Sequence, residues 1–128
     1  MHSKKQLILT ADKAFHAGHL KDSINALTAL IKLEPSKVEW LEKRAIAYLH
    51  QENFSEALKH SNIVFNSKKN DNLYLCNSHY FLIKADIYKN LKNYKKATSY
   101  LKSVDLKCGD NFDLYYYNQI KGDIYFEL

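Results

Sequence analysis

The chain has 128 residues, a mass of 15.0 kDa and a formal charge of +5, a length that fits one domain. It holds only three glycines and one proline, which argues against an all-β fold or a linker-like chain, because both need these residues at turns. No apolar run reaches the ~18 residues of a membrane-spanning helix, and the first apolar stretch is too short for a secretory signal. We therefore expect long helices joined by tight turns.

The cysteines and the charge distribution indicate a cellular compartment and the kinds of partner that the chain could attract. Cys76 and Cys108 form no CxxC pair, so neither a zinc site nor a disulfide framework is indicated, and a reducing, cytoplasmic setting is the default. Residues 66–107 contain nine lysines and three aspartates, a net charge of +6. Such a segment can attract nucleic acid or acidic protein, but a solvated lysine-rich helix face is the favoured interpretation.

Hydrophobic periodicity predicts seven helices in chain order. Ser36-Lys37-Val38-Glu39 and Asn53-Phe54-Ser55-Glu56 have the spacing of capping boxes that open the third and fourth helices. Pro35 is expected to end the second helix. The expected helices span about 4–17, 20–33, 37–51, 54–68, 71–91, 94–107 and 112–127.

Three stretches that begin at Ala11, Ala45 and Ala85 repeat one pattern with the same internal spacing, and a partial fourth copy begins at Gly122. In each, a small or aromatic residue stands three positions after the first small residue, and a polar turn, an apolar anchor and a second small residue follow. The copies lie 34, 40 and 37 residues apart. Such a unit is a pair of antiparallel helices that buries its apolar face only by stacking on its neighbours. The anchors are Leu20, Phe54 and Tyr94, and the second small residues are Ser23, Ala57 and Ala97.

A larger set of positions in the three copies can be compared with a known repeat. They are Ala11, Gly18, Leu20, Leu27, Leu30 and Pro35 in the first copy, Ala45, Tyr48, Phe54, Ala57 and Val64 in the second, and Ala85, Tyr88, Tyr94, Ala97 and Leu101 in the third. This pattern resembles the tetratricopeptide repeat (TPR). The resemblance implies an all-α fold, a right-handed α-α superhelix (a TPR-like solenoid) of about seven antiparallel helices.

The resemblance also implies a domain organisation. Residues 1–128 would form a single TPR-like domain, with repeats at about 4–37, 38–71 and 72–111 and a final helix at 112–128. Either this final helix is a polar cap, or these 128 residues are an excerpt of a longer protein.

In the family that the chain resembles, the first helix of each pair lines a concave groove in which partner peptides lie. Three of the four equivalent groove positions here hold aspartate (Asp12, Asp86 and Asp123). We expect these carboxylates to accept hydrogen bonds from the N–H groups of an extended peptide, or to pair with its Lys or Arg. The alternative, that they form salt bridges between helices on an unused face, stays open. The predicted partner-binding residues are Leu9, Asp12, Lys43, Ile46, Ile83, Asp86, Ile120 and Asp123.

One subtype of this family clamps the C-terminal carboxylate of heat-shock chaperones with Lys, Asn and Arg side chains. The matching positions here hold Ile8, Asp12, Lys43, His79 and Ile83. Only Lys43 can donate to a carboxylate, and Asp12 would repel one. We therefore do not expect the chaperone clamp.

The sequence gives no sign of catalysis. It has no Gly-rich phosphate loop and no nucleophile elbow, and His16 and His19 lack a further ligand nearby. We predict no enzyme, no catalytic, cofactor or metal site, and no membrane association. The predicted function is a protein–protein interaction module (an adaptor or scaffold) that binds a partner peptide or helix in the groove.

Other functions remain as alternatives. One is a peptide-sensing or signal-relay TPR segment of a bacterial regulator. A less favoured one is a nucleic-acid-binding helical repeat that uses the basic segment 66–107. Self-association through the C-terminal helix, with its Tyr115-Tyr116-Tyr117 cluster, is a further option.

Overall fold

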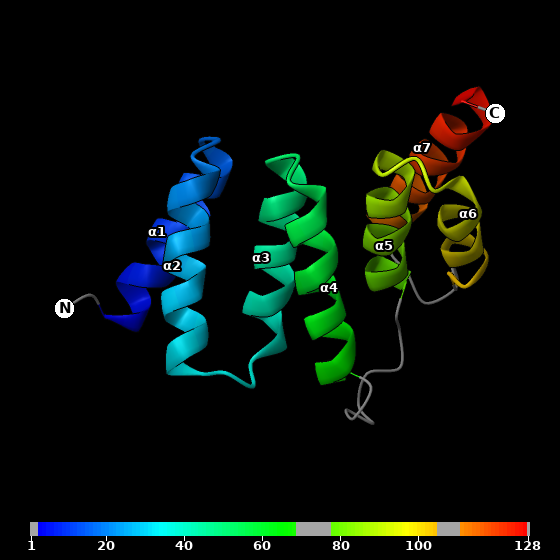
Figure 1. Cartoon of the computed structure of the whole chain (residues 1–128). Helices are drawn as coiled ribbons and strands as arrows, with labels where there is room; N and C mark the ends of the chain where they lie inside the picture. The colour runs from blue at the N-terminus through cyan, green and yellow to red at the C-terminus, as the bar shows by residue number, and fades with distance from the viewer. Residues whose placement is uncertain (1–2, 69–77, 105–110, 128) are drawn as a thin grey trace. The chain divides into compact units, whose positions relative to one another are not determined.

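A computed structural model describes residues 3–68, 78–104 and 111–127 (Figure 1). The elements in these residues are seven α-helices. Contacts within the chain group it into two compact units, Met1–Asn70 and Asp71–Leu128. Within the described ranges, no helix is both long and apolar enough to cross a membrane.

The first unit consists of two helical hairpins. α1 (Lys4–His16) packs on α2 (Leu20–Leu33), α3 (Val38–His50) packs on α4 (Phe54–Lys68), and α2 packs on α3. Apolar side chains drive this packing, because each fully buried one stabilises the fold by about 1.5–3 kcal/mol. One core cluster of this unit contains Ala11, Ala26, Leu27, Leu30 and Trp40.

The second unit contains three helices. α5 (Ser78–Asn90) packs on α6 (Tyr94–Lys102), and α7 (Asn111–Glu127) packs on both of them. Partly buried tyrosines surround the core where the three helices meet. This core contains Leu82, Ala85, Ala97, Leu101, Ile120 and Ile124.

The turns inside the three complete hairpins share one backbone geometry. Gly18, Glu52 and Lys92 occupy the same place in the repeat, and all three have positive φ, at 81°, 63° and 66°. The next residue then donates its N–H to a carbonyl at the end of the preceding helix, as in a Schellman motif. These bonds join His19 to Ala14 (2.8 Å), Asn53 to Tyr48 (3.0 Å) and Asn93 to Tyr88 (2.9 Å).

On the described residues the seven predicted helices are confirmed to within one residue at each end, except that α6 ends at Lys102. Residues 71–77 and 105–107, which the sequence assigns to the fifth and sixth helices, lie outside the described residues. The predicted capping box at Ser36 is wrong. α3 begins one residue later than expected, so Lys37 is its N-cap and makes no side-chain cap bond. The box at Asn53 stays a prediction.

Two other helix starts are capped by side chains. Ser3 and Gln6 form a reciprocal capping box on α1 (3.1 and 3.2 Å), which the sequence analysis missed. The Asn93 side chain accepts a hydrogen bond from the Lys96 N–H (3.2 Å) at the start of α6. These three bonds satisfy N–H groups that a helix leaves unpaired at its start.

Three of the four small residues that open the copies of the repeat are buried. Ala11, Ala45 and Ala85 are 3%, 1% and 0% exposed, which confirms the prediction that they allow close helix contact. Gly122, the fourth member of the series, is instead exposed, and a Cβ atom there would meet nothing within 4 Å. The prediction of a close neighbour is therefore wrong at Gly122 within the described residues.

Candidate functional site

The face formed by α1 and α3 carries an apolar side chain and a charged pair. The Lys43 ammonium on α3 lies 3.5 Å from Asp12 Oδ1 on α1 and 3.4 Å from Glu39 Oε1 on its own helix. These side chains are about half exposed, so the ion pairs add at most about 1 kcal/mol of stability. Leu9, one turn before Asp12, is 53% exposed. This face therefore presents an apolar and a charged group one helical turn apart.

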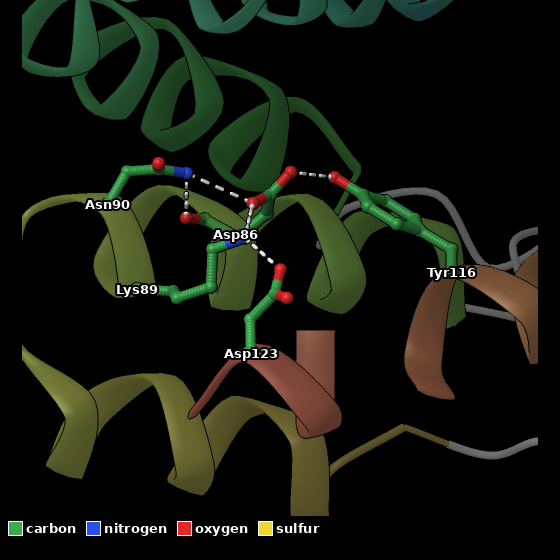
Figure 2. A network of polar contacts seen from close by, with 5 residues as sticks. All are labelled: Asp86, Lys89, Asn90, Tyr116 and Asp123. Atoms are coloured by element: carbon green, nitrogen blue, oxygen red, sulfur yellow. Dashed lines mark hydrogen bonds and ion pairs between the residues drawn. The ribbon is translucent and has the colours of Figure 1, made fainter. Parts of the chain in front are cut away.

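In the second unit, Asp86 lies at the centre of a polar network between α5 and α7 (Figure 2). Asn90 donates from Nδ2 to the Asp86 carbonyl (2.8 Å) and to Asp86 Oδ1 (3.0 Å). The Lys89 ammonium lies 3.1 Å from the same oxygen. Tyr116 on α7 donates its hydroxyl hydrogen to Asp86 Oδ2. Both oxygens of Asp86 are thus engaged inside the molecule.

Lys89 also reaches Asp123 on α7, where its ammonium donates to Oδ2 at 2.9 Å (Figure 2). The Asp123 side chain is 52% exposed, whereas that of Asp86 is 15% exposed. Asp123 therefore offers a carboxylate oxygen to solvent, and Asp86 offers little. This geometry matches the alternative of salt bridges between helices at Asp12 (to Lys43) and at Asp123 (to Lys89). Asp86 instead pairs with Lys89 on its own helix and contacts α7 through the Tyr116 hydroxyl.

The network also shifts proton affinities. Partial burial by itself lowers the pKa of Lys89, but the hydrogen bonds and negative charges of Asp123 and Asp86 outweigh it and raise the pKa overall. Burial raises the pKa of Tyr116, and the charge of Asp86 and the hydrogen bond to it raise it further. At neutral pH the network therefore holds a charged lysine and a neutral tyrosine.

The remaining predicted groove residues are less accessible. Ile46 is partly buried, and Ile83 and Ile120 are buried. Ile120 packs in the core because α7 lies against both α5 and α6. This burial leaves Ile83 and Ile120 little surface for the apolar side chains of a partner.

The five positions matched to the chaperone clamp offer one cation among the described side chains. Ile8 packs against the core of the first unit, and Ile83 is buried. Lys43 is already flanked by Asp12 and Glu39. The side chain of His79 lies outside the described residues.

Sequence reasoning missed the partners that fix Asp86. Lys89 and Asn90 stand three and four positions after Asp86 on one helix, a spacing that places side chains on the same face. That signal is present in the sequence. The contact with Tyr116 depends on how α7 packs on α5, and no local spacing predicts it.

Lys84 on α5 is a second polar residue that the sequence did not single out. It is 2% exposed, with its ammonium 6.0 and 5.9 Å from the ring centroids of Tyr88 and Tyr100. Burial, and then the positive charge of Lys96, lower its pKa from 10.5 to about 8. No group of three or more His, Cys, Asp or Glu side chains in the described ranges is arranged to hold a metal ion.

The repeated hairpins and their shared turn define an all-α helical repeat, and comparison with known proteins specifies which one. No family model and no curated protein matches the chain. A solved structure of the TPR2B domain of yeast Sti1 in a complex with pHsp70 is similar, with a TM-score of 0.79, 18% sequence identity and 98% of each chain covered. The chain therefore has a TPR-like fold.

Proposed function

We propose that this chain is a protein-interaction module that binds a segment of a partner protein on the first helices of its repeats. The TPR-like fold supports a binding role, since the similar domain of Sti1 is in a complex with pHsp70. The observation that carries the proposal is the exposed Leu9 beside the Asp12–Lys43 pair. We propose no catalysis and no cofactor, and a cytoplasmic setting.

The chemistry of this face indicates what a partner segment must present. An apolar side chain of the partner would lie on Leu9 and remove it from water, which stabilises the complex by about 25 cal/mol per Å² buried. Asp12 uses Oδ1 toward Lys43, so Oδ2 is the oxygen we assign to a partner Lys, Arg or backbone N–H. Such a segment carries an apolar residue next to a donor.

The same argument applies to Asp123 in the second unit. It occupies the same repeat position as Asp12, and its side chain is half exposed, with Lys89 on one oxygen. We propose that Asp123 also accepts hydrogen bonds from a partner, and that Asp86 positions α5 and α7 instead of binding.

The proposed partner is not a chaperone C-terminal carboxylate. Binding a C-terminal carboxylate needs several cations or N–H donors aimed at its two oxygens. Among the described side chains at the matched positions, Lys43 is the one cation, and Asp12 and Glu39 lie within 3.5 Å of it. An incoming carboxylate would meet net negative charge there.

The test is affinity capture from an extract of the source cells, followed by direct binding of the captured protein. The bait variant is Leu9→Asp, and the matched control is Leu33→Asp, because Leu33 is 58% exposed near the end of α2. Circular dichroism confirms that each bait is folded. We expect one partner to remain on the wild-type and Leu33→Asp baits and to disappear from Leu9→Asp. Equal retention on the two variant baits would refute the assignment to the α1–α3 face.

A further inference from the structure

A pair of stacked rings joins the two helices of the hairpin in both the second and the third repeat. In the second, the His60 ring on α4 stacks on the Tyr48 ring of α3, with centroids 4.8 Å apart and an interplanar angle of 6°. In the third, Tyr100 of α6 stacks on Tyr88 of α5, at 5.5 Å and 7°. His60 and Tyr100 hold the same repeat position, but only the imidazole gains a positive charge in mild acid. The second hairpin therefore has a contact that titrates in mild acid, and the third has one that does not.

The His60 ring has one nitrogen that is paired and one that is buried without a partner. Its side chain is 12% exposed, and Nε2 lies 3.3 Å from Glu56 Oε2, one turn earlier on α4. In the neutral ring Nε2 donates its hydrogen to this oxygen, so Nδ1 is the unprotonated nitrogen. Nδ1 has no hydrogen-bond partner among the described residues. A proton added there is therefore buried with no acceptor in the described part of the chain.

A second cation lies on the other helix of this hairpin. Arg44 on α3 donates from Nη1 to Thr28 Oγ1 on α2 (3.4 Å), and its Nε is also buried with no hydrogen-bond partner in the described ranges. Its positive charge acts on the His60 ring. Protonation of His60 therefore places two partly buried cations close together, and Coulomb repulsion between them is weakly screened in such surroundings.

The groups around His60 oppose its protonation on balance. Among the described residues they are Arg44 and Tyr48 on α3 and Glu56 and Lys59 on α4. Burial lowers the pKa of His60 most, and the charge of Arg44 lowers it further. Glu56 and the Tyr48 ring favour the charged form, but Glu56 is 40% exposed and therefore screened. Neither group supplies an acceptor to Nδ1.

The direction of this pKa shift fixes how pH acts on the hairpin. A solvent-exposed histidine has a pKa of 6.5, and that of the folded His60 lies below it. As the pH falls through 6.5, a state in which the ring is exposed takes up the proton first and gains population. The contact is fully stabilising above this pH, and its loss is complete once the pH is below the folded-state pKa. The core cluster of α1, α2 and α3 contains no residue of α4, so it can persist when α4 detaches.

We propose that His60 is a pH-sensitive switch between α3 and α4: when its buried ring takes up a proton, α4 opens from α3 while α1 and α2 stay folded. The switch consists of Arg44, Tyr48 and His60. It does not depend on partner binding at the α1–α3 face, so either proposal can fail without the other.

The test is hydrogen exchange, followed by mass spectrometry, on the full chain between about pH 7.5 and about pH 5. The variant is His60→Tyr, because tyrosine occupies this position in the third repeat and stays neutral in this range. The matched control is His16→Tyr, which makes the same exchange at an exposed histidine of α1. Proteins are compared at the same pH, so the intrinsic pH dependence of exchange cancels.

We expect acid to accelerate exchange in α4 of the wild type and of His16→Tyr, relative to His60→Tyr. The acceleration is at most about tenfold for each unit by which burial and Arg44 lower the pKa of His60. α1 and α2 should exchange alike in all three proteins. A 15N NMR titration of the wild-type imidazoles should show a His60 midpoint below 6.5, with the hydrogen of the neutral ring on Nε2.

Three results would overturn the proposal. The first is an equal pH dependence of α4 exchange in the wild type and in folded His60→Tyr. The second is acceleration of α1 and α2 together with α4, which would mean that the first unit opens as a whole. The third is a His60 midpoint at or above 6.5, a result that the wild type supplies even if His60→Tyr does not fold.

Discussion

Replacing the buried Lys84 by methionine should stabilise the protein at neutral pH and lose that advantage in alkali. Lys84→Met keeps a long unbranched side chain in the same space and removes the charge. At neutral pH the wild-type ammonium is charged although it is 2% exposed, with tyrosine rings nearby and Lys96 opposing it. Burying a charge in such surroundings costs free energy that an apolar side chain does not.

The magnitude follows from the pKa. Burial lowers the pKa of Lys84 from 10.5 to about 8, and each pKa unit corresponds to about 1.36 kcal/mol. Between these two values the unfolded chain binds a proton that the folded chain does not, so the stability of the wild type rises with pH. The rise is complete above 10.5 and has an upper limit of about 3 kcal/mol.

The assay is urea unfolding of both proteins at several pH values. Ionisation of the tyrosines also changes stability in alkali, but it acts on both proteins and cancels in their difference. We expect the advantage of Lys84→Met at pH 7 to shrink by about 2–3 kcal/mol by pH 10. A difference that stays constant over this range would mean that Lys84 keeps the proton affinity of an exposed lysine. Titration of its 13Cε resonance would then show a midpoint near 10.5 instead of about 8.

Three further predictions concern single side chains. Tyr116→Phe removes the donor to Asp86 and should lower the free energy of unfolding by about 1–3 kcal/mol; unchanged urea unfolding would contradict the network. Burial lowers the pKa of His60 below 6.5, so the unfolded chain takes up the proton first as pH falls. Stability should therefore decline below about pH 6.5 in the wild type, and less steeply in His60→Gln; parallel pH profiles would be evidence against this. Gly122→Ala should stabilise by about 0.5–1 kcal/mol, because α7 has room for the methyl group. Gly18→Ala should destabilise, since φ there is +81°, and thermal melts with the opposite order would refute both.

The helices and their order were predictable because they depend on local patterns. The small residues at Ala11, Ala45 and Ala85 and the polar turns recur at fixed spacing, and the structure gives the three turns the same hydrogen bonds. Because the same pattern occurs in several copies, the helices can be predicted even where one copy departs from it. At Glu52 the repeat lacks the glycine of Gly18, yet the positive φ is kept.

The candidate site was predictable only in part, because exposure depends on packing. Leu9 and Ile120 hold the same repeat position, yet Leu9 is exposed and Ile120 is buried. α7 lies against α5 and α6, and these two helices cover Ile120. Likewise, the sequence places Asp12 and Asp86 at equivalent positions, and only the structure shows that Asp86 is enclosed by its own partners.

The central claim, that a partner protein binds on the α1–α3 face, is tested most directly by site-specific photocrosslinking. A photoreactive benzoylphenylalanine is placed at Leu9 in one protein and at Leu33 in another, since both positions are exposed to a similar degree. Each is irradiated with the partner identified by affinity capture. We predict a crosslink to the partner from position 9 and none from position 33. A crosslink from position 33 alone, or equal yields from both, would contradict the claim.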